Sequence, residues 1–118
     1  MATYSKEKLS HSTNGKNIKV VATATAGTDI HTCTSATGAN YEEIWIYACN
    51  TDSSDRKLTI EWGGVASPDD LTEVTLTAEA GWVLVVPGLL LQNSLVVQAF
   101  AAAANVVEIN GYINRITA

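Results

Sequence analysis

Apolar and polar residues alternate along most of this chain with the two-residue period of β-strands. In 56–62 (RKLTIEW) every second residue is apolar, which predicts a strand with one buried face. The strongest strand signal is 41–51 (YEEIWIYACNT), where 44–49 are apolar in succession. Such a run predicts a strand whose two faces are both covered, by a second sheet or by a neighbouring subunit. Because the polar turn 52–55 (DSSD) separates these two segments, we expect them to form a hairpin.

Turn signals separate the other strand-like segments. Pro87-Gly88 is expected to end a short strand, and Asn110-Gly111 to interrupt the last one. The Ala-rich stretch 101–104 is too short and uncapped for more than one helical turn, and no other segment shows a sustained helical period. The pattern predicts an all-β domain, a jelly-roll-like β-sandwich of about eight strands. The remaining predicted strands are 18–25, 29–34, 71–78, 82–86, 95–100 and 106–117.

The first 17 residues are polar and contain the turn signal Ser12–Gly15. We therefore expect an N-terminal arm or edge strand with its first turn in 1–17, followed by a β-sandwich domain in 18–118. The start lacks the apolar core of a signal peptide, which predicts a protein that is not exported by the general pathway. In that setting Cys33 and Cys49 are expected to be free, buried thiols.

Composition narrows the possible classes of protein. The 118 residues are 47% apolar and 16% charged, with a net charge of −5. This is too apolar and too weakly charged for a disordered chain. The acidic balance and the lack of a basic cluster argue against a nucleic-acid partner. No apolar stretch reaches the length of a membrane span, so we expect no membrane partner.

Candidate metal ligands are scattered along the chain. Four residues are of the types that bind zinc: His11, His31, Cys33 and Cys49. Their spacing matches no zinc pattern. Neither cysteine lies in a nucleophile motif. Four loop carboxylates could attract calcium, but they lack the alternating oxygen ligands of an EF-hand: Asp52, Asp55, Asp69 and Asp70. Asp and Ser also form turns by themselves.

Candidate catalytic groups are equally sparse. Glu42 and Glu43 are adjacent, so they point to opposite faces of a strand and cannot act as a pair. Glu61 and Glu73 could face each other across a sheet as in a glycosidase, although exposed strand carboxylates are far commoner. We therefore predict no enzymatic activity, no catalytic residue, no cofactor and no metal.

The tryptophans and tyrosines could form a sugar-stacking platform if they lay exposed on one face. Trp62 is in register with core positions, and Trp45 lies in the segment that is apolar on both sides, which favours core or subunit-contact roles. The residues expected at contacts with other subunits or with a partner protein are Tyr4, Leu9, Trp45 and Tyr47.

The second half of the chain resembles a family of small structural proteins of tailed bacteriophages, which includes head decoration (cement) proteins. The resemblance rests on 57–64 (KLTIEWGG), 68–70 (PDD), 83–116 and the closing 111–116 (GYINRI), with 42–51 fitting the same pattern. It covers about residues 18–117 and consists of strand and turn sequences without a catalytic motif.

The resemblance implies a virion component, made in the bacterial host cytoplasm, that sits on the outer capsid surface. Its expected partners are the major capsid protein and copies of itself, as a homotrimer at local threefold positions. It would stabilise the shell by bridging capsomers, and its arm could add a strand to a neighbour's sheet edge. Two alternatives remain open: a tail or head–tail connector component, and a module that binds host-surface glycans.

Overall fold

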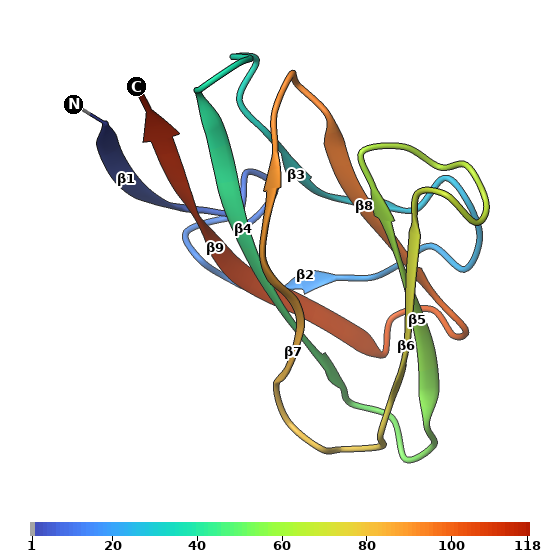
Figure 1. Ribbon diagram of the computed structural model, residues 1–118. Coiled ribbons are helices and arrows are strands. Elements are labelled where there is room, and N and C mark those ends of the chain that lie inside the picture. Colours follow the sequence, from blue (N-terminus) through green and yellow to red (C-terminus); the bar gives the residue numbers. More distant parts are fainter. Residues whose placement is uncertain (1) are drawn as a thin grey trace.

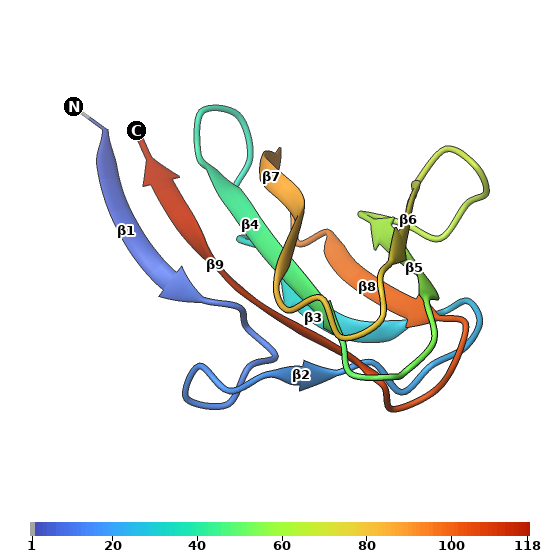
Figure 2. The same ribbon diagram turned by 90° about the horizontal axis from the view of Figure 1, so that it is seen from below.

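Nine strands make up two antiparallel sheets in the computed structural model, which describes residues 2–118. In sheet A the order is β1-β9-β4-β7, with β2 also paired to β9, and in sheet B it is β3-β8-β5-β6. The sheets face each other as two layers (Figures 1 and 2). The strands are β1 (Thr3–Lys8), β2 (Ile18–Lys19), β3 (Thr28–Thr32), β4 (Tyr41–Asn50), β5 (Arg56–Trp62), β6 (Leu71–Leu76), β7 (Val83–Leu91), β8 (Val96–Ala101) and β9 (Val107–Thr117).

The strand pairs are nested along the chain. β5 pairs with β6, β4 with β7, β3 with β8 and β2 with β9, and successive pairs fall in alternate sheets. This is the arrangement of one long hairpin folded over on itself, which is a jelly roll. The predicted all-β, jelly-roll-like sandwich is therefore confirmed. The predicted arm contributes a further edge strand, because β1 pairs with the chain's own β9 from Thr3–Thr117 to Lys8–Tyr112.

The core forms where the alternating strands face each other. On β4 the even-numbered positions are buried and the odd-numbered ones are half-buried, as the two-residue period requires. Ile44 and Ile46 of sheet A and Leu58 and Ile60 of sheet B are fully buried within the same core cluster. One face of β4 thus closes the core, and the other forms part of the outer face of sheet A.

The predicted hairpin between 41–51 and 56–62 is wrong. β4 lies in sheet A and β5 in sheet B, so the connection 51–55 crosses from one layer to the other. The Asn50 side chain holds this crossing, since its Nδ2 donates hydrogen bonds to the carbonyl oxygens of Ser54 (2.8 Å) and Leu76 (3.1 Å). A short polar turn has the same local sequence whether it joins neighbouring strands or bridges two sheets.

Three strand boundaries also differ from the prediction. β7 continues through Pro87-Gly88, because an edge strand tolerates proline and register shifts opposite on β4 absorb the irregularity. β9 continues through Asn110-Gly111. The segment 18–25 is a strand only at Ile18–Lys19, because the chain then leaves β9 and reaches sheet B, where the Ala22 carbonyl accepts from Ala101 N–H (3.1 Å).

A charged network closes one end of the sandwich. Ser10 N–H donates to His31 Nδ1 (2.9 Å), so Nε2 carries the ring proton and donates to Glu42 Oε1 (2.6 Å). Arg115 binds the other Glu42 oxygen through Nε (2.8 Å) and Nη2 (2.7 Å) and also pairs with Glu7. His31 and Glu42 are 2% and 0% exposed, so this network joins β3, β4 and β9 where the apolar core ends.

Glu61 is the second buried carboxylate. It was expected to be an exposed strand residue, but it is 0% exposed. Thr25 Oγ1 donates to its Oε2 (2.5 Å) and Gly27 N–H to its Oε1 (2.6 Å). The loop before β3 therefore covers this carboxylate, whereas Glu73 stays exposed and pairs with Lys57 at 2.6 Å.

We predict that Glu42→Ala destabilises the protein by about 3–5 kcal/mol, because it leaves the buried His31 Nε2–H without its acceptor and removes the buried one of the two carboxylates that Arg115 pairs with. The matched control Glu73→Ala removes an exposed ion pair and should cost no more than about 1 kcal/mol. Urea unfolding of both variants measures the difference. Glu42→Gln, which can still accept from His31, should fall between them. Equal losses for Glu42→Ala and Glu73→Ala would contradict this account.

Candidate functional site: an aromatic face and an apolar edge

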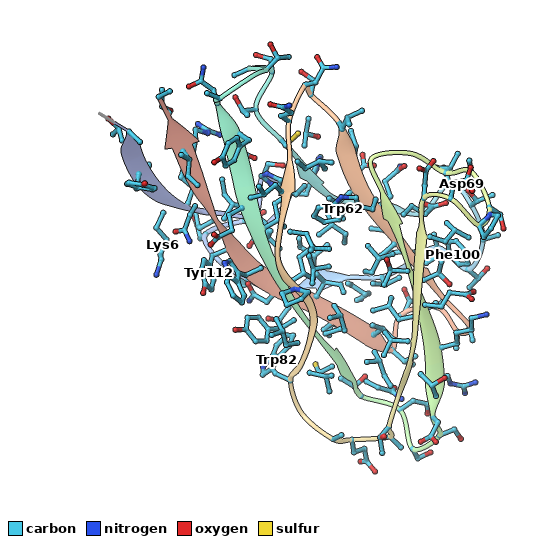
Figure 3. All side chains as sticks on the ribbon, viewed as in Figure 1. Lys6, Trp62, Asp69, Trp82, Phe100 and Tyr112 are labelled. Atoms are coloured by element: carbon cyan, nitrogen blue, oxygen red, sulfur yellow. The ribbon has the colours of Figure 1, made fainter. Side chains whose placement is uncertain are left out.

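Most aromatic side chains gather on the outer face of sheet A. The odd-numbered residues of β4 share this face with the β9 and β1 residues opposite them. Figure 3 shows Lys6, Tyr112 and Trp82 following one another down this side, while Trp62 and Phe100 lie elsewhere. We call this surface the aromatic face; its aromatic residues are Tyr4, Tyr41, Trp45, Tyr47, Trp82 and Tyr112.

The centre of the aromatic face is a pair of rings held in place by a glycine. Trp45 and Tyr112 lie directly opposite each other on β4 and β9, with centroids 6.2 Å apart and ring planes at 16°. The Trp45 indole covers Gly88 of β7 so closely that a Cβ there would stand 2.7 Å from Trp45 Cζ2. Because position 88 has no side chain, the Trp45 indole can pack flat against the β7 backbone.

Polar neighbours fix the orientation of these rings. Trp45 Nε1–H donates to Glu43 Oε1 (2.6 Å), and Asn114 Nδ2 donates to the same oxygen (3.0 Å). These hydrogen bonds stabilise the ionised carboxylate and lower the pKa of Glu43. On the other side, Lys6 Nζ lies 4.8 Å from the centre of the Tyr112 ring.

The free edge of sheet A beside this face is apolar. β7 exposes Leu84, Leu89 and Leu90 to 43%, 48% and 53% and contains no charged residue. The opposite edge strand β1 contains Lys6, Glu7 and Lys8, and the edge strands of sheet B also carry charges, at Asp29 on β3 and Glu73 on β6. Charged side chains on an edge strand discourage pairing with other chains. β7, which we call the apolar edge, lacks this protection.

The predicted contact residues divide into two groups. Tyr4 is 70% exposed, and Trp45 and Tyr47 are half-buried; all three lie on the aromatic face. Leu9 cannot serve as a surface contact, because it is 1% exposed and belongs to the core. Its position in a polar segment suggested an exposed residue, but the neighbouring Ser10 and His11 bond to β3, which turns Leu9 inward.

Sequence reasoning missed Trp82, Tyr112 and the leucines of β7 as surface residues. Trp82 had been assigned to a strand, whereas it precedes β7 and is 48% exposed. A signal was present in the β7 sequence, VLVVPGLLL, whose unbroken apolar run contains a proline. Proline in such a run favours an edge strand, and an apolar edge strand is an unusual surface.

The residues considered for metal or nucleophile chemistry have other partners. Both nitrogens of His31 are engaged in the network described above. Both cysteines are free as predicted, but only Cys33 is buried, whereas Cys49 is half-buried. Burial raises the pKa of Cys33 and of Cys49, and a carboxylate near each thiol adds to the effect. Among residues 2–118, no three His, Cys, Asp or Glu side chains gather closely enough to hold a metal ion.

The loop carboxylates considered for calcium are used separately. Asp52 forms an ion pair with Arg56 (2.6 Å), Asp55 accepts from Ala78 N–H, and Asp70 accepts from Ala66 N–H.

The part of the chain that the structure describes contains no helix long and apolar enough to cross a membrane.

Comparison with known proteins adds no relative. No family model matches the chain, and no curated protein and no solved structure matches it either.

We predict that Gly88→Ala displaces Trp45 and changes its environment, because the new methyl group would meet the indole. Gly81→Ala is the matched control: Gly81 has a similar positive φ (81° against 77°), but no atom lies within 4 Å of its would-be Cβ. Both variants should therefore pay a similar backbone penalty, of order 1 kcal/mol. Only Gly88→Ala should shift the Trp45 indole N–H signal in an NMR spectrum. An unshifted signal would disprove the proposed packing.

We predict that the Trp45 indole N–H signal follows the ionisation of Glu43 as the pH falls. The pKa of Glu43 is lowered in the folded state, so its carboxylate stabilises the fold at pH values above the ordinary glutamate pKa of about 4.3. That stabilisation is lost as the pH falls through the lowered pKa. An NMR titration should show a midpoint below the ordinary value. Glu43→Gln should remove the transition, and its persistence in that variant would assign it to another group.

Proposed function

We propose that this chain is a structural subunit of a tailed-phage particle, a head decoration protein that binds the outer surface of the capsid. The apolar edge is the observation that carries the proposal. A nine-residue edge strand without charge, with three half-exposed leucines, is a surface that soluble proteins normally protect. The resemblance of 42–51, 57–64, 68–70 and 83–116 to small phage structural proteins supports the same setting.

The apolar edge is assigned to a second copy of this chain. Pairing on β7 would satisfy its free backbone groups, except at Pro87, which has no N–H. Fully burying a leucine side chain contributes about 1.5–3 kcal/mol, so covering the remaining half of each of three leucines supplies a few kcal/mol. When β7 of one copy contacts a different surface of the next and the rotation closes, the copies form a ring, and the resemblance implies three copies.

The part of the aromatic face around Tyr4 and Trp45, away from Trp82, is assigned to the shell. Interfaces are enriched in tyrosine and tryptophan, which offer a large contact area and a polar group on the same side chain. Tyr4 and Trp45, which were expected at contacts from the sequence, lie on this face, where Trp45 pairs with Tyr112 and Tyr4 with Ile116. The major capsid protein is the partner proposed for this surface. The shell would then be stabilised because this part of the face is buried against the capsid while the apolar edge joins neighbouring copies.

We predict that purified phage particles contain this chain in hundreds of copies, as measured by quantitative mass spectrometry. The isolated protein should have a mass three times that of the 12.5 kDa chain in native mass spectrometry. Replacing Leu89 and Leu90 by lysine should give monomers, because charge on the edge strand opposes pairing.

Val21→Lys is the control, since Val21 is similarly exposed (55%) but lies outside the apolar edge. It should assemble like the unaltered protein. A handful of copies per particle would favour a tail or connector position instead. A monomeric unaltered protein would contradict the role assigned to β7.

A further inference from the structure

A shallow groove without charged residues lies at one end of the aromatic face. Its volume is about 500 Å³, which lies within the range of roughly 300–1,000 Å³ that is typical of small-ligand sites. The lining residues are Asn17, Tyr47, Trp82, Asn110, Gly111 and Tyr112. In Figure 3, Trp82 and Tyr112 lie close to each other on this side of the molecule. The lining contains no Asp, Glu, Lys, Arg or His, although the protein as a whole carries a net charge of −5.

Hydrogen bonds hold one wall of the groove in place. Asn110 Nδ2 donates to the Gly15 carbonyl oxygen (3.0 Å) and to Asn17 Oδ1 (2.9 Å), while Asn110 Oδ1 accepts from Gly111 N–H (2.7 Å). Gly111 has no side chain to fill the space, and a Cβ there would strike the Trp45 carbonyl oxygen. The position of Asn17 beside the aromatic rings is therefore set before any ligand arrives.

The groove presents unused hydrogen-bonding groups next to ring surfaces. Within residues 2–118, no hydrogen bond engages the Trp82 indole N–H, the Tyr47 hydroxyl or the Asn17 amide N–H. Trp82 is also 48% exposed. The complementary ligand is uncharged, carries several hydroxyl groups, and has an apolar C–H face to lie on an aromatic ring. A pyranose sugar has this combination.

We propose that this groove is a binding site for a neutral saccharide, with Trp82 as the stacking residue and Asn17 and Tyr47 as hydrogen-bonding residues. The site adjoins the apolar edge at Leu84 but does not include Leu89 or Leu90. Tyr47 pairs with Leu84 near one end of β4, whereas Leu89 and Leu90 pair with Ile44 and Glu43 toward the other end. The proposal goes beyond the structural role and does not depend on it.

The test is an NMR titration of the full chain with methyl glycosides and short neutral oligosaccharides of glucose, galactose and N-acetylglucosamine. At least one of these should shift the Trp82 indole N–H signal in a saturable way. Trp82→Ala should weaken that binding about tenfold or more, because it removes the stacking surface. Trp82→Phe should restore part of it. Phe100→Leu, which removes an aromatic ring from sheet B, should leave binding unchanged.

Three results would overturn the proposal. In the first, none of the neutral sugars shifts the Trp82 signal. In the second, a sugar binds the Trp82→Ala variant as well as it binds the unaltered protein. In the third case, Trp82→Ala abolishes self-association or attachment to the particle and no sugar binds, which makes the groove a protein contact. Because the Leu89 and Leu90 variant keeps the groove intact, its sugar binding separates failure of this site from failure of the assembly role.

Discussion

The register of β4 is the constraint on which both the core and the outer face of sheet A depend. Its even-numbered side chains close the core, and its odd-numbered side chains build the aromatic face. A slip of one residue would exchange the two sets. Glu42 opposes such a slip, because its buried carboxylate must meet His31 on one side and Arg115 on the other. A costly buried charge thus acts together with the apolar pattern to select one pairing.

The nested pairing around β4 leaves sheet A with two unequal edges. β1 covers one side of β9 and carries charges, so the free edge it presents resists addition of another strand. β7 covers the other side of β4 and carries none. β7 also supports the aromatic face, because Gly88 has no side chain and the Trp45 indole can therefore pack directly on the β7 backbone. The apolar edge and the aromatic face are therefore adjoining parts of one surface.

Periodicity in the sequence was enough to predict the all-β class, most strands and the opposite orientations of Glu42 and Glu43. It could not predict which strands pair, because the turn 52–55 looks the same in a hairpin and in a crossing between sheets. It also could not show that Glu61 is buried, since the groups that cover it, Thr25 and Gly27, lie far away in the sequence. The aromatic face was only partly foreseen: Trp45 and Tyr47 alternate on one strand, but Trp82 and Tyr112 join them only through pairing with β7 and β9.

The fold itself does not choose between assembly and sugar binding, because jelly rolls serve in both viral capsids and lectins. The choice depends on the chemistry of particular surfaces. At the Leu89–Leu90 end, exposed aliphatic groups and free backbone favour another protein strand. At the Trp82 end, aromatic rings beside unused amide and hydroxyl groups favour a hydroxylated ligand. Because the two ends lie on different stretches of β4, covering one with a neighbouring chain leaves the other open. A subunit held on a particle by the part of its aromatic face around Tyr4 and Trp45, and joined to its neighbours by the apolar edge, would then present the groove at Trp82 in many copies. Multiple weak sugar contacts would add up to firm attachment.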